Sequence, residues 1–409
     1  MKILLRIVFY LWVCTLTGAV LSCKDKPAEV YDNEMCTPLD SLFSTIFTDP
    51  SEPGAVVMIC HGDTILYNRS FGMADLGRDT ELTDSTVFNI ASASKTFATA
   101  AIIKLRDSGR LSLDDNLSKF FPEFPEHVFS RVTLRHVLSH TSGLPDKRPR
   151  TADQWNEYIK TNQSPFGYGP DYLLYGREEE LTSFFKTVDS LISEPGSRYE
   201  YQNAPYLLIP TIVERVTGKS YEAWMKQNIF KPAGLQETDY YDPAKPHWLM
   251  AHAYAPANRD NTDGRFRSKD GRWVEQDYGE TEFFLTRADQ GVCTSPKEFS
   301  KWIQALYKGQ IISRKSLDEV NRPVVDTDVD SIQYGLGLFV QDITSKPYKV
   351  FHNRNNGGFS IFEAVFPSQH LYYLIFSNRS DWDRYHTAKA MDSILMSHKW
   401  LTNNHHITK

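Results

Sequence analysis

Ser92 and Lys95 stand three positions apart and form the pattern in this sequence with the clearest chemical potential. A helix expected over residues 92–108 would place both side chains on one face, because residues i and i+3 are neighbours on a helix surface. The helix is apolar on nearly every side up to residue 105, so we expect it to be buried. Burial lowers the pKa of a lysine amine, which would let Lys95 take a proton from the Ser92 hydroxyl. The alternative is a serine that caps the helix beside a structural lysine.

A second serine–lysine pair with the same spacing, Ser183 and Lys186, shows that the spacing alone is not diagnostic. Both residues lie opposite an apolar helical stripe, so they are expected to face solvent, where a lysine stays protonated. We therefore expect no catalysis from this copy. The stripe consists of Leu181, Phe184, Phe185, Val188, Leu191 and Ile192.

Tyr201 and Asn203 add a phenol and an amide to the candidate groups. A phenol beside a cationic lysine can be held as phenolate and act as a base. An amide can hold a substrate carbonyl or position the lysine. The alternative is a core tyrosine followed by a capping asparagine.

His136 and His140 have the i, i+4 spacing of a metal-binding helix face, but the glutamate of the HExxH motif is missing. The chain also has no GxSxG nucleophile elbow. We expect neither a metal nor an organic cofactor.

The first residues predict export. Lys2 and Arg6 precede an apolar run from Ile7 to about Val20, which is too short to span a bilayer. The small residue before Cys23 resembles a bacterial lipobox, so residues 1–22 are expected to be a lipoprotein signal peptide and Cys23 to be lipidated. A plain signal peptide with an incidental cysteine is the alternative. Residues 23–37 are polar and are expected to form a tether to the membrane, in the periplasm or at the outer membrane.

The composition is that of a globular protein: 409 residues, 41% of them hydrophobic, with 22 Gly and 21 Pro. The formal net charge is −6 and no basic block is interleaved with aromatic residues, so nucleic-acid binding is not expected. Of the five cysteines, Cys36, Cys60 and Cys293 would remain in the mature body and could form at most one disulfide.

Strands are expected near both ends of the chain, and helices between them. This order predicts an α/β fold of the α+β type, in which an antiparallel sheet built from N- and C-terminal segments is flanked by helices. A mostly helical lobe, at about 110–280, would be inserted into a domain of residues 38–400, with a tail at 401–409. The expected strands are 55–60, 64–71, 349–352, 360–366 and 371–377. The expected helices are 39–47, 206–216, 221–229, 296–307 and 385–396.

Three ordered motifs make the sequence resemble the beta-lactamase-related serine hydrolases. They are the segment 88–95, which contains Ser92 and Lys95, the triplet 201–203, and the triplet His352-Asn353-Arg354. Segments 133–145, 218–222 and 232–235 resemble further signatures of the family, and the likeness extends over about 41–396. The family contains class C beta-lactamases, penicillin-binding carboxypeptidases, D-amino-acid peptidases and esterases.

The resemblance implies a role for each motif. Ser92 would be the acylated nucleophile, Lys95 and Tyr201 would share the proton transfers, and Asn203 would contact substrate or Lys95. The third motif would lie on a strand that lines the cleft. The backbone N–H groups of Ser92 and Asn355 would form an oxyanion hole. The residues expected to bind substrate are Asn203, His352, Asn353, Arg354 and Asn355.

Arg354 departs from the family pattern, which has glycine at this position. An arginine there would either block the cleft or clamp an anionic substrate. The leading prediction is a lipid-anchored serine hydrolase that forms an acyl-enzyme from a small-molecule or peptide substrate, cleaving an ester or amide bond. A cell-wall-type D-peptide is one candidate substrate. The alternatives are a binding or sensor protein with weakened turnover and a true beta-lactamase; the oligomeric state is left open.

Overall fold

The computed structural model describes residues 33–145, 178–242, 247–256, 272–276, 286–341, 348–356, 358–398 and 400–401. Its centre is an eight-stranded antiparallel sheet with the order β10-β11-β12-β13-β14-β15-β1-β2. The strands are β1 (Ala55–His61), β2 (Thr64–Phe71), β10 (Val325–Asp326), β11 (Ile332–Tyr334), β12 (Phe339–Gln341), β13 (Lys349–Asn356), β14 (Phe359–Phe366) and β15 (Leu371–Ser377).

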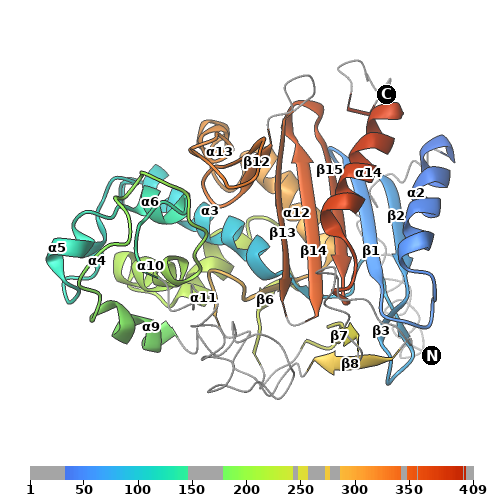
Figure 1. Cartoon of the computed structure of the whole chain (residues 1–409), viewed down its shortest axis with the longest axis horizontal. Coiled ribbons are helices and arrows are strands. Elements are labelled where there is room, and N and C mark those ends of the chain that lie inside the picture. The colour runs from blue at the N-terminus through green and yellow to red at the C-terminus, as the bar shows by residue number, and fades with distance from the viewer. Residues whose placement is uncertain are drawn as a thin grey trace, which may run out of the picture.

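The two ends of the chain meet in this sheet. β1 pairs with β15 along its whole length, with Val57 opposite Ile375, and the pair lies between β14 and β2 in the right-hand half of the structure as drawn in Figure 1. The apolar sequence of β1 explains its place, since a strand that is buried on both faces needs apolar residues at every position. The predicted fold class, with a sheet built from both termini, is confirmed.

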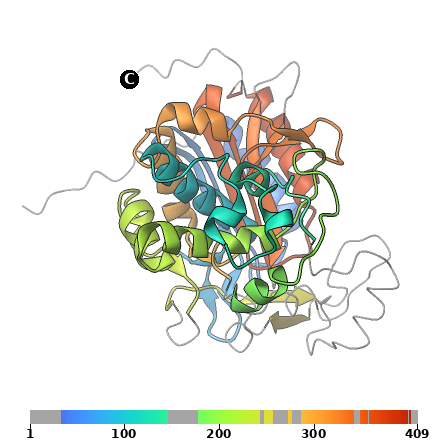
Figure 2. The same cartoon turned by 90° about the vertical axis from the view of Figure 1, so that its left-hand side faces the viewer.

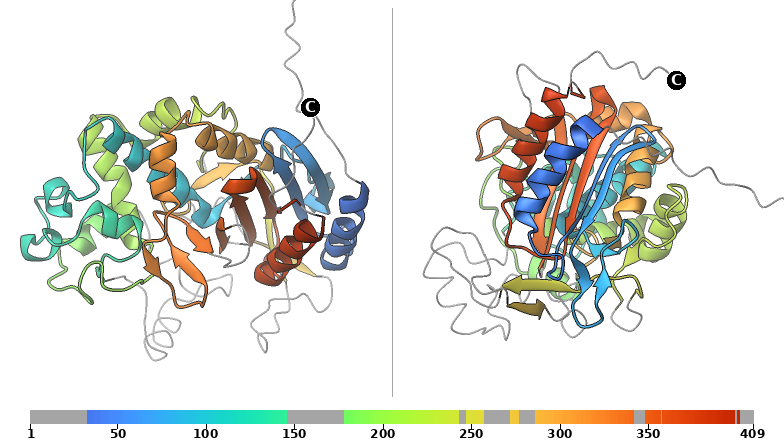
Figure 3. Two further views of the ribbon diagram at one scale, coloured as in Figure 1. Left: turned by 90° about the horizontal axis from the view of Figure 1, so that it is seen from above. Right: turned by 90° about the vertical axis from the view of Figure 1, so that its right-hand side faces the viewer.

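Helices cover both faces of the sheet. On one face, α2 (Asn33–Ile46) and α14 (Arg384–Ser397) lie side by side, as Figure 3 shows. On the other face lie α3 (Ser94–Asp107) and α12 (Pro296–Tyr307), with α13 (Arg314–Val320) beside α12. Each face has its own apolar cluster, and alternate residues of β1 belong to different clusters: Ala55, Val57 and Ile59 on the α2 face, Val56, Met58 and Cys60 on the α3 face.

A mostly helical lobe lies beyond α3, at the far end of the molecule from α2 (Figure 1), and Figure 2 looks directly onto it. It contains α4 (Leu117–Phe120), α5 (Glu126–Phe129), α6 (Leu134–Leu138), α9 (Glu178–Phe185), η2 (Ala204–Leu208), α10 (Ile209–Thr217), α11 (Tyr221–Met225) and a π-helical turn, η3 (Lys226–Phe230). The last part of the predicted lobe adds strands β6 (Asp239–Tyr240), β7 (Ala253–Pro256) and β8 (Trp273–Gln276). Two further pieces, β5 (Phe88–Asn89) and β9 (Val292–Thr294), pair next to α3, and β3 (Met73–Asp75) pairs with β4 (Thr80–Glu81).

Both predicted ends of the domain need correction. The tether was expected to reach residue 37, but α2 already begins at Asn33, because Cys36 is buried and extends the apolar stripe of Leu39 and Phe43. At the other end, Leu401 is buried in the same cluster and belongs to the body rather than to the tail. The predicted signal peptide and the rest of the predicted tail lie outside the described residues. Among those described, no helix is both long and apolar enough to cross a membrane.

The apolar stripe from Leu181 to Ile192 is helical only in its first part, α9. The helix ends at Phe185, although the apolar spacing continues to Ile192. The reason is that the backbone N–H of Ile192 donates to the carbonyl of Gly143 at 2.8 Å, so this stretch follows a neighbouring segment instead of a helix. Ser183 and Lys186 are exposed, as predicted for the second serine–lysine pair.

Candidate active site

Ser92 lies in a short 3₁₀ turn, η1 (Ala91–Ala93), that leads directly into α3 and packs against β13 and β14. Ala91 has a φ of +49°, a left-handed conformation that costs a residue with a Cβ about 1–2 kcal/mol. Asn89 holds this corner, because its Oδ1 accepts the Ala91 N–H at 2.9 Å and its Nδ2 donates to the carbonyl of Gln290 at 2.9 Å. The turn therefore holds Ser92 next to β13 and β14, directly after the strained backbone of Ala91.

Lys95 is fully buried, and in the described part of the chain its Nζ lies within hydrogen-bond distance of three oxygen atoms. These are Ser92 Oγ at 3.3 Å, Asn203 Oδ1 at 2.9 Å and the backbone carbonyl of Asp289 at 3.2 Å. A protonated amine can donate to all three oxygens. A neutral amine can donate to Asn203 and Asp289 and accept the hydroxyl proton of Ser92 with its lone pair. The geometry thus suits both protonation states of a proton-transfer group.

Two tyrosine rings flank the amine. Lys95 Nζ lies 5.0 Å from the ring centroid of Tyr201 and 5.4 Å from that of Tyr206. The Tyr206 hydroxyl donates to the carbonyl of Leu138 at 2.8 Å, and complete burial raises the pKa of Tyr206 far above its ordinary value. Tyr206 is therefore a fixed, neutral side chain beside the amine, and its hydroxyl is already bonded to the backbone.

The third motif reaches the site through His352 on β13. Its imidazole is fully buried, with ring centroids 6.5 Å from Tyr201 and 5.4 Å from Phe339. Directly opposite on β14 is Glu363, which is also buried. Burial raises the pKa of the Glu363 carboxyl well above its usual range, which favours the neutral form of this side chain beside His352.

The other residues of the third motif are not all brought to the site. Asn353 was expected to bind substrate, but its side chain lies on the opposite face of the sheet, where Nδ2 donates to the Tyr385 hydroxyl of α14 at 3.1 Å. The physical reason is that successive side chains of a strand point to opposite faces. For Arg354 and Asn355 the structure describes the backbone, which pairs with Ile361 and Ser360.

One edge of β13 faces the site. Its partner β12 pairs only with Lys349–Phe351, so within the described part of the chain the segment from His352 to Asn356 is paired on the β14 side alone. Backbone N–H and C=O groups along such an edge can receive a substrate peptide or an oxyanion.

Each of the two histidines weighed as metal ligands accepts a backbone hydrogen bond through Nδ1. His136 Nδ1 accepts the Thr133 N–H at 3.2 Å, and His140 Nδ1 accepts the Gln202 N–H at 3.2 Å. Across the described ranges, no group of three His, Cys, Asp or Glu side chains could hold a metal ion. Cys36, Cys60 and Cys293 are buried thiols.

The structure also shows site residues that the sequence did not reveal. The Asp289 carbonyl holds Lys95 through the backbone, which any residue type could do, so no residue pattern indicates it. His140 contacts the Tyr201 ring with a centroid separation of 4.2 Å, and only its histidine neighbour at position 136 had drawn attention to it. Cys23 lies outside the described residues.

Comparisons with known proteins agree with this geometry. The family model described as "Beta-lactamase" matches residues 39–395. Penicillin-binding protein 4* of Bacillus subtilis is 28% identical over 365 residues, which cover 87% of this chain and 75% of that protein. Two solved structures share the fold. The octameric penicillin-binding protein homologue from Pyrococcus abyssi has a TM-score of 0.70 and 24% identity, and the match covers 88% of this chain and 77% of that one. The D-amino acid amidase from Ochrobactrum anthropi SV3, complexed with D-phenylalanine, has a TM-score of 0.68 and 21% identity, and the match covers 90% of this chain and 99% of that one. Ser92, Asn203 and the Tyr201 ring all lie close to the Lys95 amine. Together with the family match over most of its length, this arrangement shows that the chain belongs to the beta-lactamase family.

Proposed function

We propose that this protein hydrolyses an ester or amide bond through an acyl-enzyme formed on Ser92. One observation carries the proposal: a buried lysine amine lies 3.3 Å from the Ser92 hydroxyl and is held there by Asn203 and the Asp289 carbonyl. A serine hydroxyl needs an adjacent base to become a good nucleophile. Lys95 is proposed as this base, and its bonds to Asn203 and Asp289 fix its position.

In the proposed reaction, Ser92 Oγ attacks the substrate carbonyl while its proton passes to the Lys95–Tyr201 pair. The carbonyl oxygen becomes an oxyanion, which the backbone N–H groups of Ser92 and Asn355 stabilise. The same pair then protonates the leaving alcohol or amine as the carbonyl–leaving-group bond breaks. In the second half a water molecule attacks the acyl-enzyme and gives up its proton to the pair. As the bond between the carbonyl carbon and Ser92 Oγ breaks, the pair passes this proton to Oγ, so that the acid leaves and Ser92 is restored.

The proposed substrates are small esters and amides, with D-peptides of the cell-wall type among them. The likeness to a penicillin-binding protein and to a D-amino acid amidase supports this class. We also propose that the protein is an exported lipoprotein, held at the membrane by a lipid on Cys23. The basic and apolar start of the chain supports this location.

The test uses the chain lacking residues 1–23 and a fluorophosphonate probe. Ser92 is expected to gain the mass of the probe, and Ser92→Ala is expected to abolish labelling. Ser183→Ala is the matched control, because it removes the exposed serine of the second serine–lysine pair. Labelling that survives Ser92→Ala would contradict the proposal. A panel of p-nitrophenyl esters, D-Ala-D-Ala peptides and a cephalosporin then defines the leaving group.

A binding or sensor protein with weak turnover is the second candidate. One observation favours it: Ser92 has no exposed surface in this structure. In that case the probe or a slow substrate would acylate Ser92, but the acyl-enzyme would persist and no substrate of the panel would turn over. Rapid hydrolysis of the cephalosporin, with esters and peptides left intact, would instead identify a beta-lactamase.

A further inference from the structure

We propose that His140 is a positioning residue that fixes Tyr201 beside Lys95, and this inference rests on the proposed function of Tyr201. The contacts that carry the inference join His140 to the Tyr201 ring and to the backbone N–H groups of Glu200 and Gln202. The influence of His140 on the reaction would therefore pass through the tyrosine.

His140 holds the backbone on both sides of Tyr201. The N–H of Glu200, the residue before Tyr201, donates to the His140 carbonyl at 2.8 Å. The N–H of Gln202, the residue after it, donates to His140 Nδ1 at 3.2 Å. Since Nδ1 accepts a hydrogen bond, a neutral imidazole at this position carries its proton on Nε2. One residue thus holds the backbone N–H of the residue before Tyr201 and that of the residue after it.

The imidazole ring fixes the side chain as well. Its centroid lies 4.2 Å from the Tyr201 ring, 5.0 Å from the Tyr206 ring and 4.8 Å from the Tyr334 ring, and His140 is only 2% exposed. A ring wedged among three others in a packed interior has little freedom to move. Displacement of the imidazole would leave a space into which the Tyr201 ring could shift.

The backbone of His140 explains how one residue makes both kinds of contact. Its φ is +56°, a left-handed conformation in which histidine is found more often than most residues. This turn aims the carbonyl and the ring of the same residue at segment 200–202. The Gln202 side chain adds two hydrogen bonds between segment 200–202 and the segment that contains His140. Its Nε2 donates to the Leu144 carbonyl at 2.6 Å, and its Oε1 accepts from Ser142 Oγ at 3.3 Å.

The experiment separates the two contacts with two variants. His140→Asn keeps an acceptor at the δ position and tolerates the left-handed backbone, but it loses the ring. His140→Phe keeps a ring and loses the acceptor. The readouts are the rate at which the fluorophosphonate probe labels Ser92, and kcat and KM for p-nitrophenyl acetate. We expect the His140→Phe variant to label at least about tenfold more slowly, with kcat falling and KM little changed, because small misplacements of a catalytic group cost large factors in rate.

Each variant is also made in a Tyr201→Phe background. If His140 acts through Tyr201, its substitution adds little to the loss that Tyr201→Phe already causes. Losses that multiply would overturn the positioning role. A Tyr201→Phe variant with full activity would contradict the proposed function of the tyrosine, which is a separate failure.

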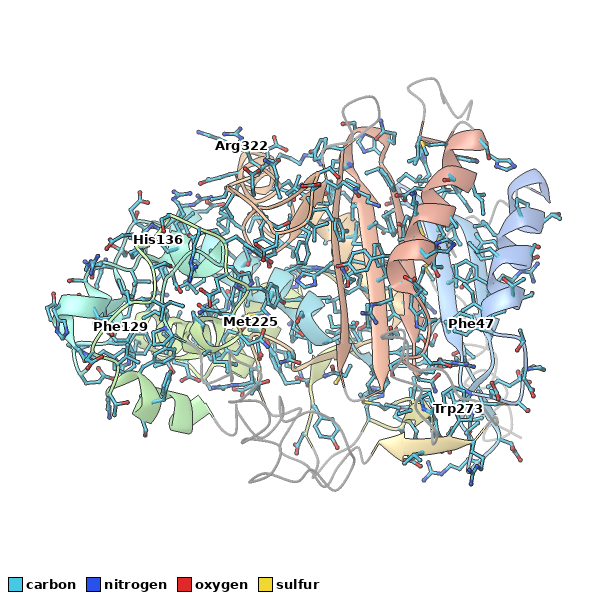
Figure 4. The ribbon with its side chains drawn as sticks, in the orientation of Figure 1. Phe47, Phe129, His136, Met225, Trp273 and Arg322 are labelled. Carbon is cyan, nitrogen blue, oxygen red and sulfur yellow. The ribbon has the colours of Figure 1, made fainter. Side chains whose placement is uncertain are left out.

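His136→Asn is the matched control. His136 belongs to the same segment and also accepts a backbone N–H with Nδ1, but it lies in the helical lobe, where Figure 4 labels it, and its bond is to Thr133. We expect it to leave the labelling rate unchanged. Thermal unfolding of every variant shows which ones fold. If His140→Phe does not fold, the test is made with His140→Asn, which is the milder change. A His136→Asn loss as large as that of the His140 variants would mean that the segment acts only through stability.

Discussion

Glu363 offers a prediction about stability that can be worked out from its surroundings. It lies 6% exposed on β14 opposite His352, whose backbone N–H its carboxyl accepts as a hydrogen bond. It lines a cavity of about 50 Å³ between α3, α12 and the sheet, whose other walls include Ala100, Trp302 and Val350. Burial in these apolar surroundings disfavours the charged form and raises the pKa of Glu363 well above 4.5.

The raised pKa makes stability fall as pH rises. Above the ordinary pKa of a carboxyl, the unfolded chain releases the Glu363 proton while the folded chain keeps it. The folded state then binds one proton more, and the free energy of unfolding falls by about 1.4 kcal/mol for each pH unit up to the folded-state pKa. Glu363→Gln keeps the size and stays neutral at every pH. We therefore expect its stability relative to wild type to increase by about 1.4 kcal/mol per pH unit in that window.

The assay is urea unfolding of both proteins at several pH values from 4 to 8. The two stabilities should be similar near pH 4, where both side chains are neutral, and should diverge as pH rises. Parallel stability curves over this range would refute the reasoning, since they would mean that Glu363 ionises as easily in the folded protein as in the unfolded chain.

A second buried glutamate provides the control. Glu298 accepts hydrogen bonds from Gln236 N–H at 2.8 Å, Glu237 N–H at 2.9 Å and the Thr238 hydroxyl at 2.8 Å. Glu298→Gln would turn an amide group toward these donors, and we expect it to destabilise the protein by about 1–3 kcal/mol. The contrast with Glu363→Gln shows that the partners of a buried carboxyl, and not burial alone, decide the sign.

Four further predictions concern activity and location. Lys95→Ala and Tyr201→Phe are each expected to lower kcat by roughly a hundredfold or more, and the double variant to be little worse than either, as kinetic analysis of all three would show. Asn203→Ala removes the 2.9 Å bond to Lys95 Nζ and should slow acylation roughly tenfold in single-turnover assays. Cys23→Ala should release the protein from the membrane fraction, with no lipid mass on its N-terminus. Arg354→Gly should lower kcat/KM for substrates with a free carboxylate more than for neutral esters.

The sequence predicted best what depends on local geometry. Ser92 and Lys95 share a helix face because of their spacing, and the structure places their side chains in contact. The strands also followed from composition, since apolar runs such as that of β1 can only lie inside a sheet covered on both faces. That Tyr201 and Asn203 join the same site came from the family resemblance, because nothing in local spacing brings residues about a hundred positions apart together.

The sequence predicted least well which way the residues of β13 point. Alternation of apolar and polar residues normally reveals the two faces of a strand, but helices cover both faces here and residues 352–356 are all polar. The side of Asn353 was therefore hidden until its bond to Tyr385 was visible. The start of α2 was missed for a related reason: Cys36 acts as a small apolar residue in the packing against the sheet, within a segment whose other residues looked like a polar linker.

Arg354→Gly on β13 has three distinguishable outcomes, and each corresponds to a different role of the arginine. The residue follows His352 by two positions on the edge that faces the site, where the family pattern has glycine. A guanidinium directed at the substrate would pair with a carboxylate, and its loss would lower kcat/KM for acidic substrates about ten- to a hundredfold, as expected for a charge-assisted bond of about 1.5–3 kcal/mol. A guanidinium that closes the cleft would give the opposite result, since Arg354→Gly would then raise activity on every substrate and support a sensor with weak turnover. Unchanged rates and unchanged selectivity would contradict both roles. The three outcomes therefore test whether Arg354, the motif residue that departs from the family pattern, sets the charge preference for the substrate.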